Sequence, residues 1–352
     1  MEEKDKLLDS QEENSKPKII FIISTIVLVF AGIIYAGILL FTADHSIKIP
    51  TDVSTYSNIE QINTKLINFD WEIDFEKQMI KGRVDLTVVA MQDGINQVCL
   101  DTYNLTIKKV YDANGNNFSK VELRELAASA PFLGQPLWIT LNSPLKATNE
   151  TIIKIEYETA QKPMALSWIK KENTLAKTLP MVFSQCEPIY CRSLAPLQDS
   201  PSIKSKYTAT VRVPRLADNF PVFMSAITTN VQASPQYLTY KFESPIPIPS
   251  YGIAITAGAY QTEKISSRVT LIAENISLYK DHLAGVGENL LVNLEKYMNI
   301  PYPWSLYQIV VLPASFPYGG MENPLLTFVH PLIFEGKDKS GLNVVVHEMA
   351  HS

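Results

Sequence analysis

The residues best suited to chemistry stand in the motif HEMAH, which occupies residues 347–351. His347 and His351 are four positions apart, so on a helix they share one face and can hold one zinc ion together. Glu348 between them can accept a proton from a zinc-bound water while the metal polarises a substrate carbonyl. The apolar residues Val344–Val346 directly before the motif favour a buried helix. We therefore interpret His347 and His351 as metal ligands and Glu348 as the catalytic base.

A second motif, PYGGMENP, occupies residues 317–324. Its paired glycines, Gly319 and Gly320, let a substrate backbone approach closely, and an exposed edge strand beside them can pair with an extended peptide. Glu322 can then bind an ammonium group. Taken alone, the run would be interpreted as a Gly-Gly turn followed by a solvated Glu. Beside a zinc motif it indicates a peptide-binding site.

The elements that position these motifs begin with strands. Apolar and polar residues alternate in residues 69–75, 84–88, 153–157 and 208–213, and this alternation predicts an antiparallel, mainly β domain over residues 62–260. Pro245, Pro247 and Pro249 predict an edge or a crossover near them, because proline cannot donate to a central ladder.

The pattern changes after residue 260. Apolar residues at helical spacing predict an amphipathic helix over residues 286–298, and residues 307–312 read as a strand. A last helix begins near Ser340, which we expect to be its N-cap. The sequence therefore predicts a second, mixed α and β domain over residues 261–352.

Composition excludes some classes of function. The 31 Lys plus Arg and 36 Asp plus Glu give a net charge of -5 with no basic stretch, so we expect no nucleic-acid partner. The 3 Cys are too few for a disulfide-stapled scaffold. Cys186 and Cys191 are interpreted either as a disulfide or as two free thiols.

Residues 19–41 carry no charge, and as a helix they would span roughly 34 Å, enough to cross a bilayer. The lysines cluster before this segment, which predicts a cytoplasmic N-terminus. We therefore expect a cytoplasmic tail (1–18), a transmembrane signal anchor (19–41) and a stalk (42–61), with the bilayer as a partner. This would make a single-pass type II membrane protein whose catalytic part is extracellular or lumenal.

Together the two motifs resemble those of the zinc aminopeptidases of peptidase family M1. Residues 183–187, 191–192, 312–324 and 326–329 are most similar to the leukotriene A4 hydrolase and aminopeptidase B branch, and the resemblance covers residues 68–352. It implies a saddle-like, mainly β N-terminal domain followed by the start of a thermolysin-like α+β catalytic domain. It also implies a metal-dependent aminopeptidase that removes N-terminal residues from peptides with a free N-terminus.

The resemblance also implies roles for single residues. Glu322 would recognise the α-amino group of the substrate, and Gln185 and Glu187 would line the first substrate pocket. Because the most similar branch tends to have Gln where Glu187 stands, this charge favours a peptide with a protonated N-terminus. The substrate-binding residues implied are Gln185, Glu187, Gly319, Gly320, Met321, Glu322 and Asn323.

The family's third ligand for its one Zn2+ ion is a Glu on the helix that follows, which would lie beyond Ser352. We therefore expect an incomplete catalytic domain that binds zinc weakly and is inactive as it stands. Two alternatives remain open: a non-catalytic, membrane-anchored peptide-binding module, and a lipid epoxide hydrolase of the leukotriene A4 hydrolase type. The sequence does not indicate an oligomeric state.

Overall fold

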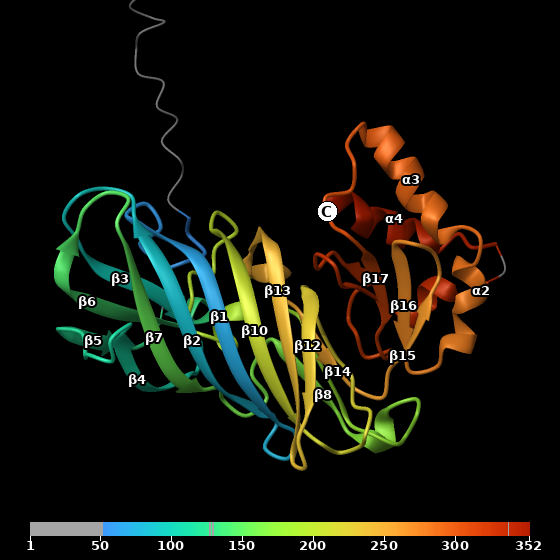
Figure 1. Ribbon diagram of the computed structural model, residues 1–352, viewed down its shortest axis with the longest axis horizontal. Coiled ribbons are helices and arrows are strands. Elements are labelled where there is room, and N and C mark those ends of the chain that lie inside the picture. Colours follow the sequence, from blue (N-terminus) through green and yellow to red (C-terminus); the bar gives the residue numbers. More distant parts are fainter. Residues whose placement is uncertain (1–51, 127, 129, 337) are drawn as a thin grey trace, which may run out of the picture. The chain divides into compact units, whose positions relative to one another are not determined.

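The computed structural model describes residues 52–352, apart from 127, 129 and 337 (Figure 1). Strands dominate as far as residue 264, and the helices follow later in the chain. The mainly β character predicted for the first part of the chain is therefore confirmed.

The largest sheet has seven strands (Figure 1). In spatial order they are β12 (Ile227–Ala233), β13 (Tyr237–Pro249), β10 (Lys204–Pro214), β1 (Ile62–Asp74), β2 (Met79–Ala90), β7 (Glu150–Glu158) and β4 (Thr106–Asp112). Neighbours are antiparallel except β1 and β10, which are parallel. The expectation of a purely antiparallel sheet was wrong at this pair. The chain passes through other strands between β2 and β10, so β10 returns by a long crossover, as parallel pairing requires.

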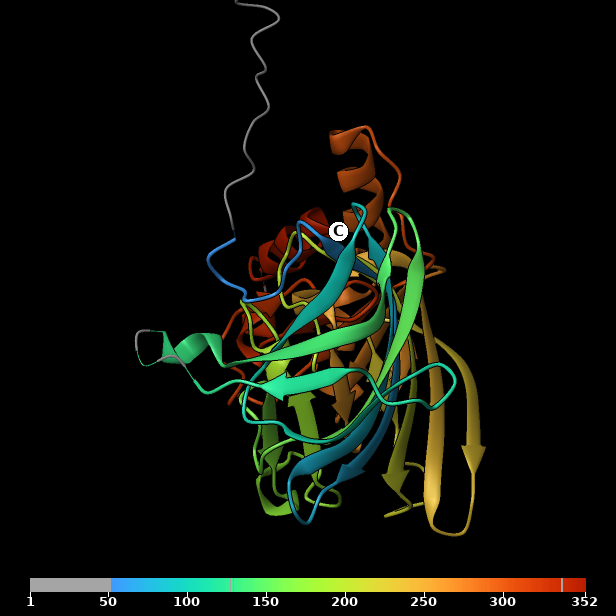
Figure 2. The ribbon, with the colours of Figure 1, turned by 90° about the vertical axis from the view of Figure 1, so that its left-hand side faces the viewer.

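A three-stranded sheet packs against the large sheet, as the turned view shows (Figure 2). Its strands are β3 (Ile95–Thr102), β6 (Gln135–Leu145) and β5 (Lys120–Leu123). Leu100 and Leu137 of this sheet share one buried cluster with Leu86 and Ile155 of the large sheet. Burial alternates along the strands of the large sheet, because every second side chain faces this cluster.

The three prolines fall in the last part of β13. Strand β12 pairs only with Leu238–Glu243, so beyond Glu243 strand β13 has a hydrogen-bonded neighbour on one side alone, β10. Proline lacks a backbone N–H and is tolerated there. The prolines therefore do lie at a locally exposed edge, although the strand that carries them is an interior one in its first half.

Two further sheets face each other and position the motifs. One has the order β11 (Val222–Met224), β14 (Ile255–Ala257), β9 (Met181–Ser184) and β8 (Leu166–Ile169). The other has the order β15 (Gln261–Lys264), β16 (Val269–Ala273), β17 (Tyr307–Val311), β19 (Thr327–Val329) and β18 (Gly320–Met321). Phe183 of β9 packs with Val310, Met321 and Phe328 of the second sheet in one buried cluster. This packing places the end of β9 beside β18.

Among the described residues, the α-helices are α2 (Lys280–Leu283), α3 (Gly287–Met298) and α4 (Leu342–His351). Helix α3 and strand β17 confirm the elements predicted over residues 286–298 and 307–312. Helix α4 confirms the final helix, but its N-cap is Gly341 and makes no side-chain cap bond. The prediction of Ser340 as N-cap was wrong, because the Ser340 hydroxyl instead donates to Asp338 Oδ1 at 3.0 Å.

Arg268, the residue before β16, forms salt bridges with two glutamates of α3. Its guanidinium donates to Glu288 at 2.8 Å and to both carboxylate oxygens of Glu295 at 2.7 and 3.0 Å. Glu295 also accepts from the backbone N–H of Tyr302 at 2.8 Å. The Arg268 hydrogen bonds, followed by that of Tyr302, lower the pKa of Glu295 to about 2. The loop after α3 is thereby tied to the helix.

Arg192 lies at the centre of a buried polar cluster and is 1% exposed. Its guanidinium donates to Asp199 Oδ2 at 3.0 Å, to the Leu133 carbonyl at 2.7 Å and to the Ser54 carbonyl at 2.7 Å. The structure thus places the described half of the predicted stalk, residues 52–61, against the first domain. Nearby, Cys186 and Cys191 are both buried as free thiols, which settles the alternative that the sequence left open.

The prediction of a single-pass membrane protein needs correction. The segment on which it depended, residues 19–41, lies outside the described residues. Within residues 52–352, leaving aside 127, 129 and 337, no helix is long and apolar enough to cross a bilayer. A spanning helix needs ~20 mostly apolar residues, whereas α3 is 12 residues long in all and carries Glu288, Glu295 and Lys296. The structure therefore gives no support to the predicted type II orientation. The same holds for the extracellular or lumenal catalytic part and for the bilayer as a partner.

The Arg192 cluster generates a prediction about stability. We expect Arg192→Ala to lower the free energy of unfolding by about 3–5 kcal/mol, because it leaves the buried Asp199 carboxylate without its partner. The matched control is Arg215→Ala, since Arg215 pairs with Asp218, whose side chain is 94% exposed. That change should cost less than ~1 kcal/mol. Urea unfolding measures both, and equal losses would contradict a structural role for the Arg192 cluster.

Candidate active site

Helix α4 brings the two motif histidines together on its exposed face. The Nε2 atoms of His347 and His351 are 3.2 Å apart. Two nitrogens bound to one tetrahedral zinc ion at ~2.0–2.1 Å lie roughly 3.3–3.4 Å apart, so the pair fits as two ligands of such an ion. Across residues 52–352 without the gaps named above, no group of three or more His, Cys, Asp or Glu side chains is arranged to hold a metal.

Glu348 points away from solvent, and the residue is 5% exposed. Burial is the main reason why its pKa is raised to about 7, and the nearby carboxylates of Glu322 and Glu187 add to the effect. A carboxyl group with such a pKa is suited to accept and release a proton near neutral pH.

The backbone of Gly320 lies directly against Glu348. A Cβ atom at Gly320 would overlap Glu348 Oε1 and would lie only 2.6 Å from Cδ and 2.7 Å from Cγ of the same side chain. At Gly319, by contrast, a Cβ would find nothing closer than Val344 at 3.8 Å. The two glycines are therefore not equivalent: the close approach of β18 to α4 leaves no room for a Cβ atom at 320.

The side chains of the three residues after Gly320 lie in different surroundings. Met321 is buried in the cluster between the two facing sheets. Glu322 is partly buried, and its Oε1 lies 4.0 Å from His351 Nδ1. Asn323 is 3% exposed and donates to the Leu326 carbonyl at 3.4 Å, within a turn closed by the Leu326 N–H at 2.9 Å. The structure thus brings Glu322 close to His351 of the histidine pair and turns Asn323 away from it.

Gln185 and Glu187 arrive from the other sheet, directly after β9. Gln185 Nε2 lies 3.2 Å from Met321 Sδ, to which it donates, and its Oε1 has no hydrogen-bond partner in the described part of the chain. Burial raises the pKa of Glu187, and the carboxylate of Glu322 raises it further, while His351 opposes the shift. Three carboxyl groups from three elements, Glu187, Glu322 and Glu348, therefore gather around the histidine pair.

Tyr251 is a residue of this neighbourhood that sequence reasoning missed. It stands in the short 3-10 helix Ser250–Gly252, and its phenol pKa is raised by burial and by the carboxylates of Glu322 and Glu187. It lines a cavity of about 280 Å3 together with Glu322, His351 and Trp304. No motif marks it, although the proline run just before it indicates a special segment.

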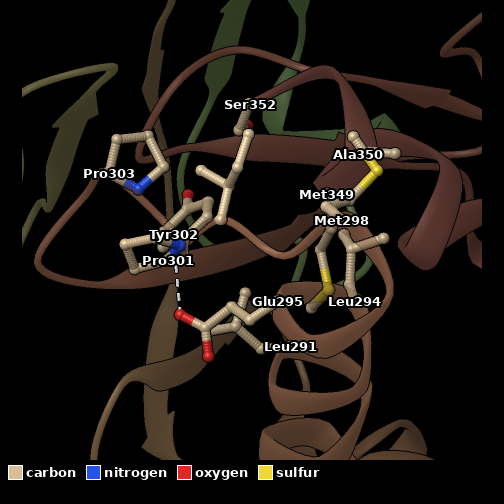
Figure 3. A pocket seen from close by; sticks show the side chains of 11 residues that line it. Leu291, Leu294, Glu295, Met298, Pro301, Tyr302, Pro303, Met349, Ala350 and Ser352 are labelled. Atoms are coloured by element: carbon tan, nitrogen blue, oxygen red, sulfur yellow. Dashed lines mark hydrogen bonds between the residues drawn. The ribbon is translucent and has the colours of Figure 1, made fainter.

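The opposite face of α4 closes one side of an apolar cavity of about 240 Å3 (Figure 3). Met349 and Ala350 reach it from α4, and Leu291, Leu294 and Met298 reach it from α3. Met349 is buried in the same cluster as Leu291. Because Met349 lies between the two histidines in sequence, its packing here fixes the rotation of α4 and turns His347 and His351 the other way.

Comparison with known proteins agrees with this geometry. Residues 63–251 match the model of the Peptidase M1 N-terminal domain, and residues 284–352 match that of the Peptidase family M1 domain. The chain belongs to peptidase family M1. The family resemblance carried by the two motifs is therefore confirmed.

Relatives within family M1 include hydrolases of two kinds. Leukotriene A-4 hydrolase of Xenopus laevis is 37% identical over 304 residues, which are 86% of this chain and 48% of that protein. Leucine aminopeptidase 2 of Sclerotinia sclerotiorum is 36% identical over 310 residues, 86% of this chain and 50% of that one. The chain thus spans about half the length of these relatives.

Solved structures in the family are also similar. The structure of yeast LTA4 hydrolase in complex with bestatin has a TM-score of 0.77 and 30% sequence identity. It is matched over 87% of this chain and 46% of the yeast chain. The structure of native LTA4 hydrolase from Saccharomyces cerevisiae has a TM-score of 0.76.

The difference in free space around Gly319 and Gly320 gives a prediction for this M1 site. We expect Gly320→Ala to displace the Glu348 carboxyl group from its present position, because a Cβ there overlaps it. Gly319→Ala should leave Glu348 where it is. Crystal structures of both variants provide the measurement. An unmoved Glu348 in Gly320→Ala, or an equal shift in both variants, would contradict the close approach.

Proposed function

We propose that this chain carries the first part of the active site of a zinc-dependent aminopeptidase. The observation that supports it is the position of Glu322 relative to the histidine pair. Its carboxylate lies 4.0 Å from His351, whose Nε2 faces that of His347 at 3.2 Å. A carboxylate this close to the metal pair would bind a substrate ammonium about one residue from the reacting carbonyl, so only a terminal residue would be removed.

The metal would supply Lewis-acid polarisation of the scissile carbonyl and a water of lowered pKa. His347 and His351 would hold it through their facing Nε2 atoms. Glu348 would accept the proton of the attacking water and pass it to the leaving amine. The contact of Glu348 with Gly320 would keep its carboxyl group beside the edge strand β18, along which the peptide backbone would lie.

The free α-amino group would be held by charge. Burial raises the pKa of Glu187, and repulsion by the Glu322 carboxylate raises it further. A bound ammonium would relieve that repulsion. Gln185 Oε1, which has no partner among the described residues, can accept a further hydrogen bond from the same group. Gly319, Gly320 and Met321 would flank the peptide, and Asn323 would support their turn.

We also propose the domain boundaries expected from the sequence, with a β-rich domain over 62–260 and a zinc peptidase domain from 261 onward. In the described residues the two histidines find no third ligand. We therefore propose that the chain as given binds zinc weakly and is inactive without the Glu that family M1 uses as its third ligand.

The role of Glu348 can be tested kinetically. In a form of the protein that also supplies the third ligand, Glu348→Gln should lower kcat for aminoacyl-naphthylamide hydrolysis roughly 100- to 10,000-fold, because the base is lost. The exposed Glu263 of β15 offers a control, and Glu263→Gln should retain wild-type turnover. Zinc content measured alongside excludes metal loss as the cause. Equal rates for wild type and Glu348→Gln would remove the proposed base.

A second candidate is hydrolysis of a lipid epoxide. It is favoured by the similarity to leukotriene A-4 hydrolase of Xenopus laevis. Glu187 argues for the peptide reaction instead, because a second carboxylate beside Glu322 suits an ammonium group. Hydrolysis of lipid epoxides by the same protein would distinguish the two reactions. Absence of epoxide turnover would exclude epoxide hydrolysis as the function.

A further inference from the structure

The two histidines of α4 face each other in a way that constrains their protons. Their Nε2 atoms are 3.2 Å apart, within hydrogen-bond distance. Two neutral imidazoles in this arrangement need one Nε2–H donor and one Nε2 acceptor, because two protons would clash and none would leave two lone pairs opposed. The geometry of the pair alone does not say which ring donates.

The surroundings of the second ring nitrogen of His351, Nδ1, indicate which ring donates. His351 Nδ1 faces Glu322 Oε1 at 4.0 Å, and the Glu322 side chain is only 15% exposed. In the part of the chain that the structure describes, this contact with the Glu322 carboxylate and the bond to His347 are the polar contacts of the His351 ring. Glu187 also acts on His351 through its charge, but no contact within 4.0 Å joins them. A carboxylate facing Nδ1 favours a proton on that nitrogen.

We propose that Glu322 is a positioning residue that keeps the proton of His351 on Nδ1. Nε2 of His351 is then the acceptor, and His347 is the donor of the hydrogen bond between the rings. His351 thus presents the Nε2 lone pair that a zinc ion requires before any metal arrives. Zinc-binding histidines commonly gain orientation and basicity from a carboxylate on their other nitrogen. The inference rests on the proposed zinc site and gives Glu322 a second task besides holding the substrate's amino group.

One carboxylate can serve both tasks because it has two oxygens and about four acceptor positions. Oε1 faces His351, which leaves other positions free for an ammonium group. Glu322 reaches His351 because it stands two residues after Gly320, directly after the end of β18. The close approach of β18 to α4 carries the following residue of the chain to the last turn of the helix, where His351 stands.

Two-bond proton–nitrogen correlation NMR of the imidazole rings tests the assignment in zinc-free protein. At about pH 8, where histidines are ordinarily neutral, wild-type His351 should carry its proton on Nδ1. In Glu322→Ala the signal should shift towards the Nε2-protonated form. Glu322→Gln, which keeps an oxygen at this place but removes the charge, should shift the tautomer less than Glu322→Ala does. Glu187→Gln, which removes a charge of the same cluster, should leave the tautomer unchanged.

His282 and His330 give internal references for folding, since both lie outside the site and each has its own backbone partner. Unchanged signals from them show that a variant is folded. An Nε2-protonated His351 in the wild type would overturn the proposal. So would a tautomer that does not respond to Glu322→Ala in a folded variant, or one that responds equally to Glu187→Gln.

Zinc affinity, measured by competition with a chromogenic chelator, gives a second readout. Glu322→Ala should weaken zinc binding roughly 10- to 100-fold, and Glu187→Gln should weaken it clearly less. Equal weakening would mean that only total charge matters and would overturn the positioning role. The NMR result is obtained without metal or substrate. Failure of peptide hydrolysis would therefore sink the proposed function and leave the tautomer assignment standing.

Discussion

The candidate site depends on the close approach of strand β18 to helix α4. Glu348 rests directly on the backbone of Gly320, with no room for a Cβ atom between them. This contact sets the separation between β18, the last strand of its sheet, and a helix that carries two histidines and a carboxyl group. It also carries Glu322 to the end of the same helix. The residues proposed to face the substrate and the metal are thus positioned by one constraint.

The rest of the fold holds the two sides of this contact in place. Below α4, Met349 packs with Leu291 of α3 and sets the rotation of the helix. Behind β18, Met321 is buried against Phe183 of β9, and the same packing delivers Gln185 and Glu187 to the site. The motif residues therefore come from three separate elements that meet only because two sheets pack face to face.

Bringing Glu187, Glu322 and Glu348 together is unfavourable without a cation. The raised pKa values of Glu187 and Glu348 reflect burial and this mutual repulsion. A substrate ammonium and a divalent metal ion are the two cations that the arrangement would accept, one beside Glu322 and one between the histidines. The electrostatics of the site thus favours the ligands that an aminopeptidase needs.

Local sequence patterns were sufficient for much of this structure. Alternation indicated strands, and helical spacing indicated α3. The two motifs supplied His347, His351, Glu348 and Glu322, and the family resemblance added Gln185 and Glu187. Contacts between distant segments were not visible. The parallel pairing of β1 with β10 depends on a long crossover that no local pattern encodes. Tyr251 enters the site only through packing, and Ser340 missed the cap because Asp338 competes for its hydroxyl. The membrane location, inferred from an apolar segment alone, was corrected.

X-ray absorption at the zinc edge of the zinc-loaded chain tests the central claim most directly. We expect scattering from two imidazole rings, those of His347 and His351, with zinc–nitrogen distances of ~2.0–2.1 Å. One ring should be lost in either single alanine variant, and His282→Ala should change nothing. Zinc bound without imidazole scattering, or with the same two rings after His347→Ala, would contradict the site described here.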